Sequence, residues 1–184
     1  MHELWQLFDE QGNALQGEGA TKDDIFAKGL LHGASHVWIW RKKEDFVEVL
    51  LQKRAANKRT WPNRLDISAA GHIDLGEDPL TAAMRETKEE IGLKVDQESL
   101  QEFGKVKTYM TAENGAIENE FQWLYLLKFA DNSEFTLQEA EVDSLAWKKL
   151  DDFVIECGSD LYVPHGEEYY GKVISAIKTA SSNG

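Results

Sequence analysis

Residues 71–93 read GHIDLGEDPLTAAMRETKEEIGL, and this stretch contains the clearest helix signal in the chain. Asp78 is a favourable N-cap residue, Pro79 suits the first helical position, and Gly92 stands where a glycine commonly ends a helix. The residues between Asp78 and Gly92 are mostly strong helix formers. We therefore predict a helix over 79–91.

Acidic side chains gather on one side of this predicted helix. Glu86, Glu89 and Glu90 are spaced i, i+3 and i+4, so they project from the same side. Arg85 can hold one of the carboxylates, and Glu77 lies in the loop just before the helix. Converging carboxylate oxygens are the ligands that Mg²⁺ or Mn²⁺ prefers. The alternative, and the commoner meaning of E-x-x-E-E alone, is a solvated helix face rich in glutamate.

The spacing of the whole stretch resembles the Nudix box, G-x5-E-x7-R-E-U-x-E-E-x-G-U, where U is a bulky aliphatic residue. Thr87 departs from the pattern, and the residues that match it are Gly71, Glu77, Arg85, Glu86, Glu89, Glu90, Gly92 and Leu93. The resemblance implies that the three helix glutamates bind Mg²⁺ or Mn²⁺, that Arg85 orients a glutamate, and that Gly71 shapes the loop backbone. It implies hydrolysis of a small organic diphosphate, because divalent cations neutralise the diphosphate and activate water. Glu86 and Glu90 are then candidate catalytic residues.

A second resemblance points to one branch of this family. Residues 32–72 are similar to the type I isopentenyl-diphosphate isomerases and their hydrolase-like relatives, whose pattern Q-x-R-x-x-x-K-x-x-x-P-x-x-x-D/N is matched by Gln52, Arg54, Lys58, Pro62 and Asp66. The resemblance assigns Arg54 and Lys58 to the phosphates of the substrate. Both belong to a basic cluster that also contains Lys53, Arg59 and Arg64. The alternative is a solvated loop that balances nearby acids.

Isomerase chemistry is not expected, because Ala70 occupies the place of the isomerase cysteine and cannot transfer a proton. Cys157 lies in a poorly matching region. Three hypotheses therefore remain: a hydrolase of a nucleoside diphosphate-type substrate, an isomerase with an unusual catalytic residue, and an inactive diphosphate-binding module.

Histidines and late acidic residues match metal ligands of the isomerase branch. His32, His72 and Glu118 form a candidate second metal site, although a structural role is commoner for such a histidine. Glu118 and Glu120 share one face of a strand-like run. In the family, an acidic residue of this region completes the metal site or acts as a base. We therefore predict Glu120 as a metal ligand and catalytic residue.

The 184 residues, 42% of them hydrophobic, are enough for one domain, 1–184. The chain mixes strands with two or more helices, which favours a single layered α/β domain, and the Nudix resemblance implies a single-domain α/β/α sandwich with a mixed β-sheet. The expected elements are a hairpin at 3–16, helices at 21–30, 79–91 and 167–180, and strands at 34–40, 46–52, 66–70, 103–111, 120–129 and 146–150. Segments 108–119 and 155–170 are the expected specificity loops.

Charge and composition restrict the partners. The formal net charge is −13, from 33 acidic and 20 basic residues, which disfavours nucleic-acid polymers and anionic membranes as partners. The first ten residues, MHELWQLFDE, lack a signal-peptide pattern, and the single cysteine suits a reducing compartment, so we expect a cytoplasmic protein. The expected partner is a small-molecule diphosphate, and the resemblance also suggests a homodimer.

Overall fold

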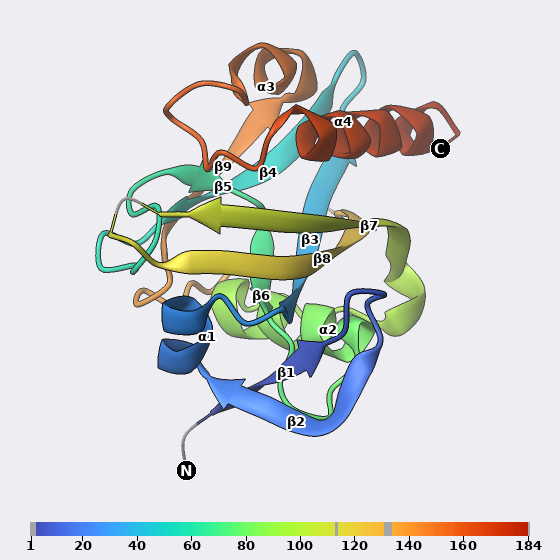
Figure 1. Cartoon of the computed structure of the whole chain (residues 1–184). Coiled ribbons are helices and arrows are strands. Elements are labelled where there is room, and N and C mark those ends of the chain that lie inside the picture. Colours follow the sequence, from blue (N-terminus) through green and yellow to red (C-terminus); the bar gives the residue numbers. More distant parts are fainter. Residues whose placement is uncertain (1–2, 113, 131–133, 184) are drawn as a thin grey trace.

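The computed structural model describes residues 3–112, 114–130 and 134–183. Helices cover both faces of a mixed sheet, which confirms the predicted α/β/α sandwich (Figure 1). The strands are β1 Leu4–Phe8, β2 Ala14–Thr21, β3 His32–Lys42, β4 Val47–Arg54, β5 Leu65–Asp66, β6 Ala69–His72, β7 Leu100–Thr111, β8 Ile117–Lys128 and β9 Val142–Lys149. The helices are α1 Lys22–Lys28, α2 Pro79–Ile91, α3 Leu150–Glu156 and α4 Glu167–Ser182, with a 3-10 turn at Gln97–Ser99.

Strand β3 organises the sheet. One edge pairs in parallel with β8 along its length, and this register sets His32 opposite Glu120. The other edge is divided, because β6 pairs with residues 34–37 and β4 pairs with residues 40–42, both antiparallel. This division brings β3, β4, β6 and β8 to the wall of one pocket, described below.

Alternate residues of β3 enter two separate cores, as the two-residue period of a strand requires. Trp38 and Trp40 pack with residues of α3 and α4. Val37 and Ile39 pack with Ala82, Ala83 and Ile91 of α2. Helix α2 is therefore fixed to the opposite face of the sheet from α3 and α4.

The predicted boundaries of α2 are confirmed. The Asp78 side chain accepts two backbone N–H bonds from the first turn, each 3.0 Å long, and Gly92 ends the helix with a φ of 73°. The Thr87 hydroxyl donates to the Ala83 carbonyl at 2.7 Å, so this departure from the aliphatic pattern leaves no unpaired hydroxyl in the core. The helix is thus seated by its apolar face and presents its glutamates at the other side.

The predicted strand at 66–70 is wrong, since two short strands, β5 and β6, occupy this region. They are separated by Ile67 and Ser68. The Ser68 hydroxyl accepts the Ile39 N–H at 2.8 Å and donates to the Leu50 carbonyl at 2.6 Å, so it bridges β3 and β4 where these strands diverge. Helix α3 was not predicted, because strand-like residues run directly into it. The remaining predicted strands and helices are confirmed, with most strands longer than expected.

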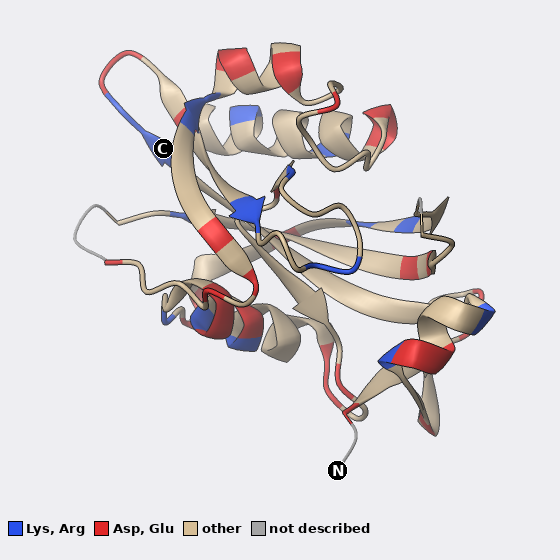
Figure 2. Cartoon of the chain, turned by 90° about the vertical axis from the view of Figure 1, so that its left-hand side faces the viewer, with Lys and Arg blue, Asp and Glu red and all other residues tan. Residues whose placement is uncertain are grey.

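Charged residues lie mostly on helices and loops, and the central strands carry fewer of them (Figure 2). Helix α2 carries acidic and basic positions side by side. Within the described ranges, no helix has the length and apolar character needed to cross a membrane.

Candidate active site

One pocket of about 310 Å³ collects most of the residues singled out from the sequence. It is lined by parts of β3, β4, β5, β6, β8 and α2, and by segments that follow β8 and α3. The predicted residues on its wall are Arg54, Lys58, Gly71, His72, Arg85, Glu86, Glu89, Glu90, Glu118 and Glu120. His32 is fully buried beside Glu120, and Glu77 lies behind Arg85.

The three α2 glutamates differ in environment. The Glu90 carboxylate is buried and accepts the Ala70 N–H at 3.0 Å, whereas the Glu89 side chain is 53% exposed. Burial raises the pKa of Glu90 to about 8, against the opposing effects of the Ala70 N–H and Lys58. Burial also raises the pKa of Glu86 to about 7, although Arg85 opposes the shift. Both carboxyl groups are therefore harder to ionise than an ordinary glutamate, and a bound cation would favour their ionised forms.

Gly71 is required by the position of the Glu86 carboxyl group. A Cβ atom at residue 71 would lie 1.9 Å from Glu86 Cδ, far closer than van der Waals contact allows. The backbone of Gly71 lies outside the left-handed region, so its role is to leave space. A larger residue here would displace Glu86 from the wall of the pocket.

Arg85 connects the loop before α2 to the helix glutamates. Its Nε and Nη2 donate to the two Glu77 carboxylate oxygens at 3.0 and 2.8 Å, a forked pair. Its Nη1 donates to Glu86 at 2.6 Å and to Glu89 at 3.3 Å, and Nη2 also donates to the His72 carbonyl at 2.8 Å. One guanidinium thus neutralises and orients several carboxylates whose mutual repulsion would otherwise disorder the helix face.

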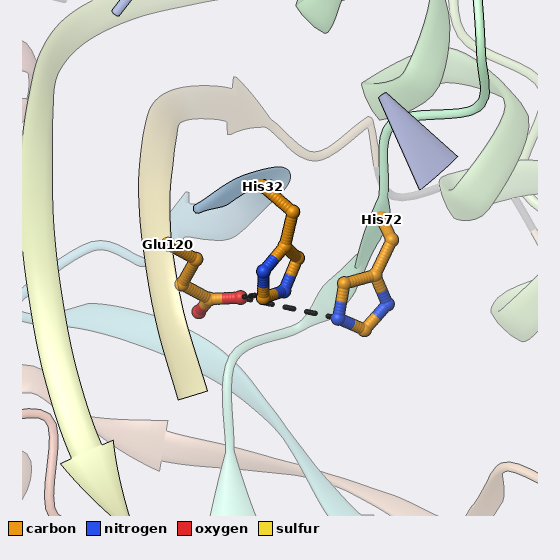
Figure 3. Close-up of side chains that lie close together, drawn as sticks. All are labelled: His32, His72 and Glu120. Atoms are coloured by element: carbon orange, nitrogen blue, oxygen red, sulfur yellow. Dashed lines mark ion pairs between the residues drawn. The ribbon is translucent and has the colours of Figure 1, made fainter. Parts of the chain in front are cut away.

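His32, His72 and Glu120 come from β3, β6 and β8 and converge on one point (Figure 3). One candidate ligand atom from each residue lies within 4.8 Å of the others. The Glu120 carboxylate lies 3.3 Å from His32 Nε2 and 3.9 Å from His72 Nε2. The set fits a divalent cation, because a carboxylate suits Mg²⁺ or Mn²⁺ and imidazole nitrogens suit transition metals such as Zn²⁺ and Fe²⁺.

The protonation of this cluster suits metal binding. His32 Nδ1 lies 3.0 Å from the Leu30 carbonyl, which only accepts, so Nδ1 carries the hydrogen and Nε2 faces Glu120. Burial and His32 lower the pKa of His72. Burial opposes ionisation of Glu120, but the histidines hold its pKa below the usual range. Trp5 stacks on the His72 ring, with centroids 3.5 Å apart, and fixes its plane.

Glu118, predicted alongside the two histidines, lies on the same pocket but outside the compact group. The β3–β8 register explains this, since it is Glu120 that stands opposite His32.

The basic cluster separates into two parts. Arg54 and Lys58 line the pocket, whereas Lys53 pairs with Asp143, Arg59 pairs with Asp23, and Arg64 donates to a backbone carbonyl. Arg54 donates to Asp66 at 2.9 Å and to the Thr60 carbonyl at 3.0 Å, and Lys58 pairs with Glu141. Only part of this basic run is therefore placed to meet a ligand in the pocket.

Several pocket residues were not singled out as site residues from the sequence. Among them are His36, Gln138, Glu141 and His165. Gln138 and Glu141 come from a segment that pairs with the end of α2 through backbone bonds, among them Gln138 N–H to the Glu90 carbonyl at 2.9 Å. No sequence pattern indicates these positions, because they reach the pocket only through the tertiary fold of the chain.

The place of the isomerase cysteine is occupied by Ala70, whose methyl group has no proton to transfer and which lines the pocket. Cys157 is buried in the core formed with α3 and α4, and it is absent from the described wall of the pocket. The cysteine therefore does not replace the missing thiol.

Comparison with known proteins identifies the family of this chain. The NUDIX domain profile matches residues 30–165. The chain is 32% identical over 171 residues to Nudix hydrolase 3 of Arabidopsis thaliana, covering 88% of this chain but only 22% of that protein. It is 29% identical over 184 residues to an isopentenyl-diphosphate Delta-isomerase of Aliivibrio fischeri, covering 98% of this chain and 100% of that protein.

A solved structure shows the same fold. The NUDIX domain of Shewanella oneidensis NrtR, solved in complex with ADP ribose, superposes with a TM-score of 0.59 at 15% identity, covering 89% of this chain and 99% of that one. The profile match spans well over half of the chain, and the chain therefore belongs to the Nudix family, in the branch that also contains proteins similar to isopentenyl-diphosphate isomerases.

Proposed function

We propose that this protein is a divalent-metal-dependent hydrolase that cleaves a diphosphate linkage in a small organic molecule, with a nucleoside diphosphate derivative as the preferred class. The observation that carries the proposal is the convergence of the α2 glutamates, the His32–His72–Glu120 cluster and two basic residues on one pocket. Hydrolysis of a diphosphate needs both metal ligands and basic residues, because the charge of the diphosphate must be neutralised while water attacks it.

The cations have two candidate sites. Glu86, Glu89 and Glu90 would hold Mg²⁺ or Mn²⁺ at the carboxylate site, and His32, His72 and Glu120 would hold a second cation at the histidine site. Bound cations would offset the charge of the diphosphate and activate water. The chain's own residues have separate tasks: Arg54 and Lys58 bind phosphate oxygens, Arg85 orients Glu86, and an ionised glutamate accepts the proton of the attacking water.

Two alternatives remain testable. Relatives named as isopentenyl-diphosphate isomerases favour an isomerase, but Ala70 lacks a transferable proton. A binding module would need no such concentration of carboxylates. ADP ribose bound to the related NrtR domain favours including nucleoside diphosphate sugars among the test substrates.

The test is a mass-spectrometric screen of the purified protein with Mg²⁺. The panel contains nucleoside triphosphates, nucleoside diphosphate sugars, dinucleotides and isopentenyl diphosphate, and Glu90→Gln serves as the blank. Cleavage of one class by the wild type alone supports the hydrolase. Conversion of isopentenyl diphosphate to its isomer, resolved by chromatography, would support the isomerase. Binding without turnover of any compound would support the binding module.

Arg54→Ala is expected to raise KM by roughly tenfold while kcat changes much less, because a charged hydrogen bond to phosphate contributes about 1.5–3 kcal/mol to binding. Arg59→Ala is the matched control, since Arg59 belongs to the same basic cluster but pairs with Asp23 and is not among the residues that line the pocket. Steady-state kinetics of both variants give the comparison. An unchanged KM for Arg54→Ala would show that Arg54 does not bind the phosphates of the substrate.

The two cation sites should respond differently to pH. Cation binding at the carboxylate site requires Glu86 and Glu90 to lose protons, and their pKa values of about 7 and about 8 lie above the usual range. Affinity there should rise more than about tenfold between about pH 6 and about pH 8. Cation affinity at the histidine site should change little between these pH values, because burial already lowers the pKa of His72 well below its ordinary value.

Electron paramagnetic resonance of free Mn²⁺ measures both sites. His72→Gln should lose the pH-insensitive binding and keep the pH-dependent binding. A variant that binds Mn²⁺ with the same number of sites as the wild type would show that His72 is not a ligand.

A further inference from the structure

The segment between α3 and α4 carries His165 to the wall of the active-site pocket. Its backbone is held beside β5: the Val163 N–H donates to the Leu65 carbonyl at 3.0 Å, and the Leu65 N–H donates to the Leu161 carbonyl at 2.8 Å. The Tyr170 hydroxyl also donates to the Val163 carbonyl at 2.6 Å. These bonds fix the position of His165 relative to β5.

The His165 ring makes one side-chain hydrogen bond among the described residues, to Asp66. Its Nε2 lies 2.8 Å from Asp66 Oδ1, and the other Asp66 oxygen accepts the 2.9 Å bond from Arg54. The His165 side chain is only 6% exposed, and its ring stacks on Tyr169 with centroids 4.5 Å apart. Nδ1 is buried and has no hydrogen-bond partner within the described ranges. Asp66 therefore links the segment before α4 to Arg54.

The chemistry of Asp66 explains why two donors are needed. Burial opposes ionisation of this carboxyl group, but His165 and Arg54 together hold its pKa below the usual range. An ionised carboxylate accepts only, so His165 Nε2 carries the hydrogen and donates it. Without His165, a buried carboxylate would lose one of its donors, which is costly and leaves the group freer to shift.

We propose that His165 is a positioning residue for the phosphate site: it holds Asp66, and Asp66 holds the guanidinium of Arg54 at the wall of the pocket. The inference rests on the proposed role of Arg54. It extends the substrate site to the segment before α4, which is remote from the Nudix box in sequence. His165 acts on the substrate through Arg54.

Two substitutions separate positioning from packing. His165→Phe keeps a flat ring that can stack on Tyr169 but removes the hydrogen-bond donor. His165→Gln can place its amide nitrogen where Nε2 lies and restore the bond to Asp66. His165→Asn is a second variant without the bond, because its side chain is too short to reach Asp66 from the same backbone position.

The measurement is calorimetric binding, in the presence of Mg²⁺, of methylenediphosphonate, a diphosphate analogue whose P–C–P bridge is not hydrolysed. We expect His165→Phe and His165→Asn to weaken binding roughly tenfold and His165→Gln to remain within about twofold of the wild type. In an Arg54→Ala background, His165→Phe should have almost no further effect, because both changes remove the same contact. Thermal melting confirms that each variant is folded.

Wild-type affinity in His165→Phe and His165→Asn would overturn the inference, as would an undiminished effect of His165→Phe in the Arg54→Ala background. A wild-type protein that binds no methylenediphosphonate would instead overturn the phosphate site itself. Failure of the inference is thus distinguishable from failure of the proposed function.

Discussion

Glu90→Gln is expected to reduce kcat/KM by at least about a thousandfold, which corresponds to about 4 kcal/mol of transition-state stabilisation. Glutamine has the same size, but it cannot become the anion that a divalent cation requires. The substituted side chain still offers an oxygen to the Ala70 N–H, the bond that positions Glu90 at 3.0 Å. The loss should therefore appear in catalysis and in cation binding, while the fold is kept.

Stability provides the internal check for this variant. Burial raises the pKa of Glu90 to about 8, so without cations the group is protonated at neutral pH and a neutral amide replaces it at little cost. We expect the free energy of unfolding to change by less than about 1 kcal/mol. Glu102→Gln, at an exposed position on β7, is the matched control and should keep full activity. Wild-type turnover by Glu90→Gln would show that Glu90 is not a metal ligand.

Arg85→Lys is expected to lower activity by about a hundredfold and the free energy of unfolding by about 2 kcal/mol. Lysine keeps the positive charge but loses the planar fork that binds both oxygens of Glu77. It also cannot reach Glu86, Glu89 and the His72 carbonyl at the same time. The substitution should therefore leave the α2 glutamates less ordered and weaken the connection between α2 and the loop before it.

The control for Arg85 is Arg41→Lys. Arg41 is a comparably buried arginine whose Nε bonds Glu48 at 2.7 Å, outside the active-site pocket. This control should lose some stability and keep activity, because Arg41 does not line the active-site pocket. Chemical denaturation and steady-state kinetics of the two variants separate the effects. If Arg85→Lys lost only as much activity as Arg41→Lys, Arg85 would have a purely structural role.

Much of the fold could be predicted from local signals. Helix α2 is marked by Asp78, Pro79 and Gly92, and the structure has the same boundaries. The region around Ser68 could not be predicted in the same way. Its division into β5 and β6 depends on a hydroxyl that bridges Ile39 and Leu50, and those bonds exist only after β3 and β4 have diverged.

In the candidate active site, too, some features have a local sequence signal and others depend on tertiary structure. The α2 glutamates could be predicted because helical spacing and a long motif fix their relative positions. His32 and Glu120 were individually named, but their closeness depends on the β3–β8 register, which is set by tertiary packing. His165 meets Asp66 across 99 residues of sequence, and no local pattern encodes that contact.

The most direct test of the central claim is hydrolysis in ¹⁸O-labelled water with Mg²⁺, with the products analysed by mass spectrometry. The metal-dependent hydrolase predicts that one phosphate-bearing product gains a single ¹⁸O atom, and that neither label nor cleavage is detected with Glu90→Gln. Conversion of isopentenyl diphosphate to its isomer without cleavage or ¹⁸O in any phosphate, and no cleavage of any other diphosphate, would contradict it.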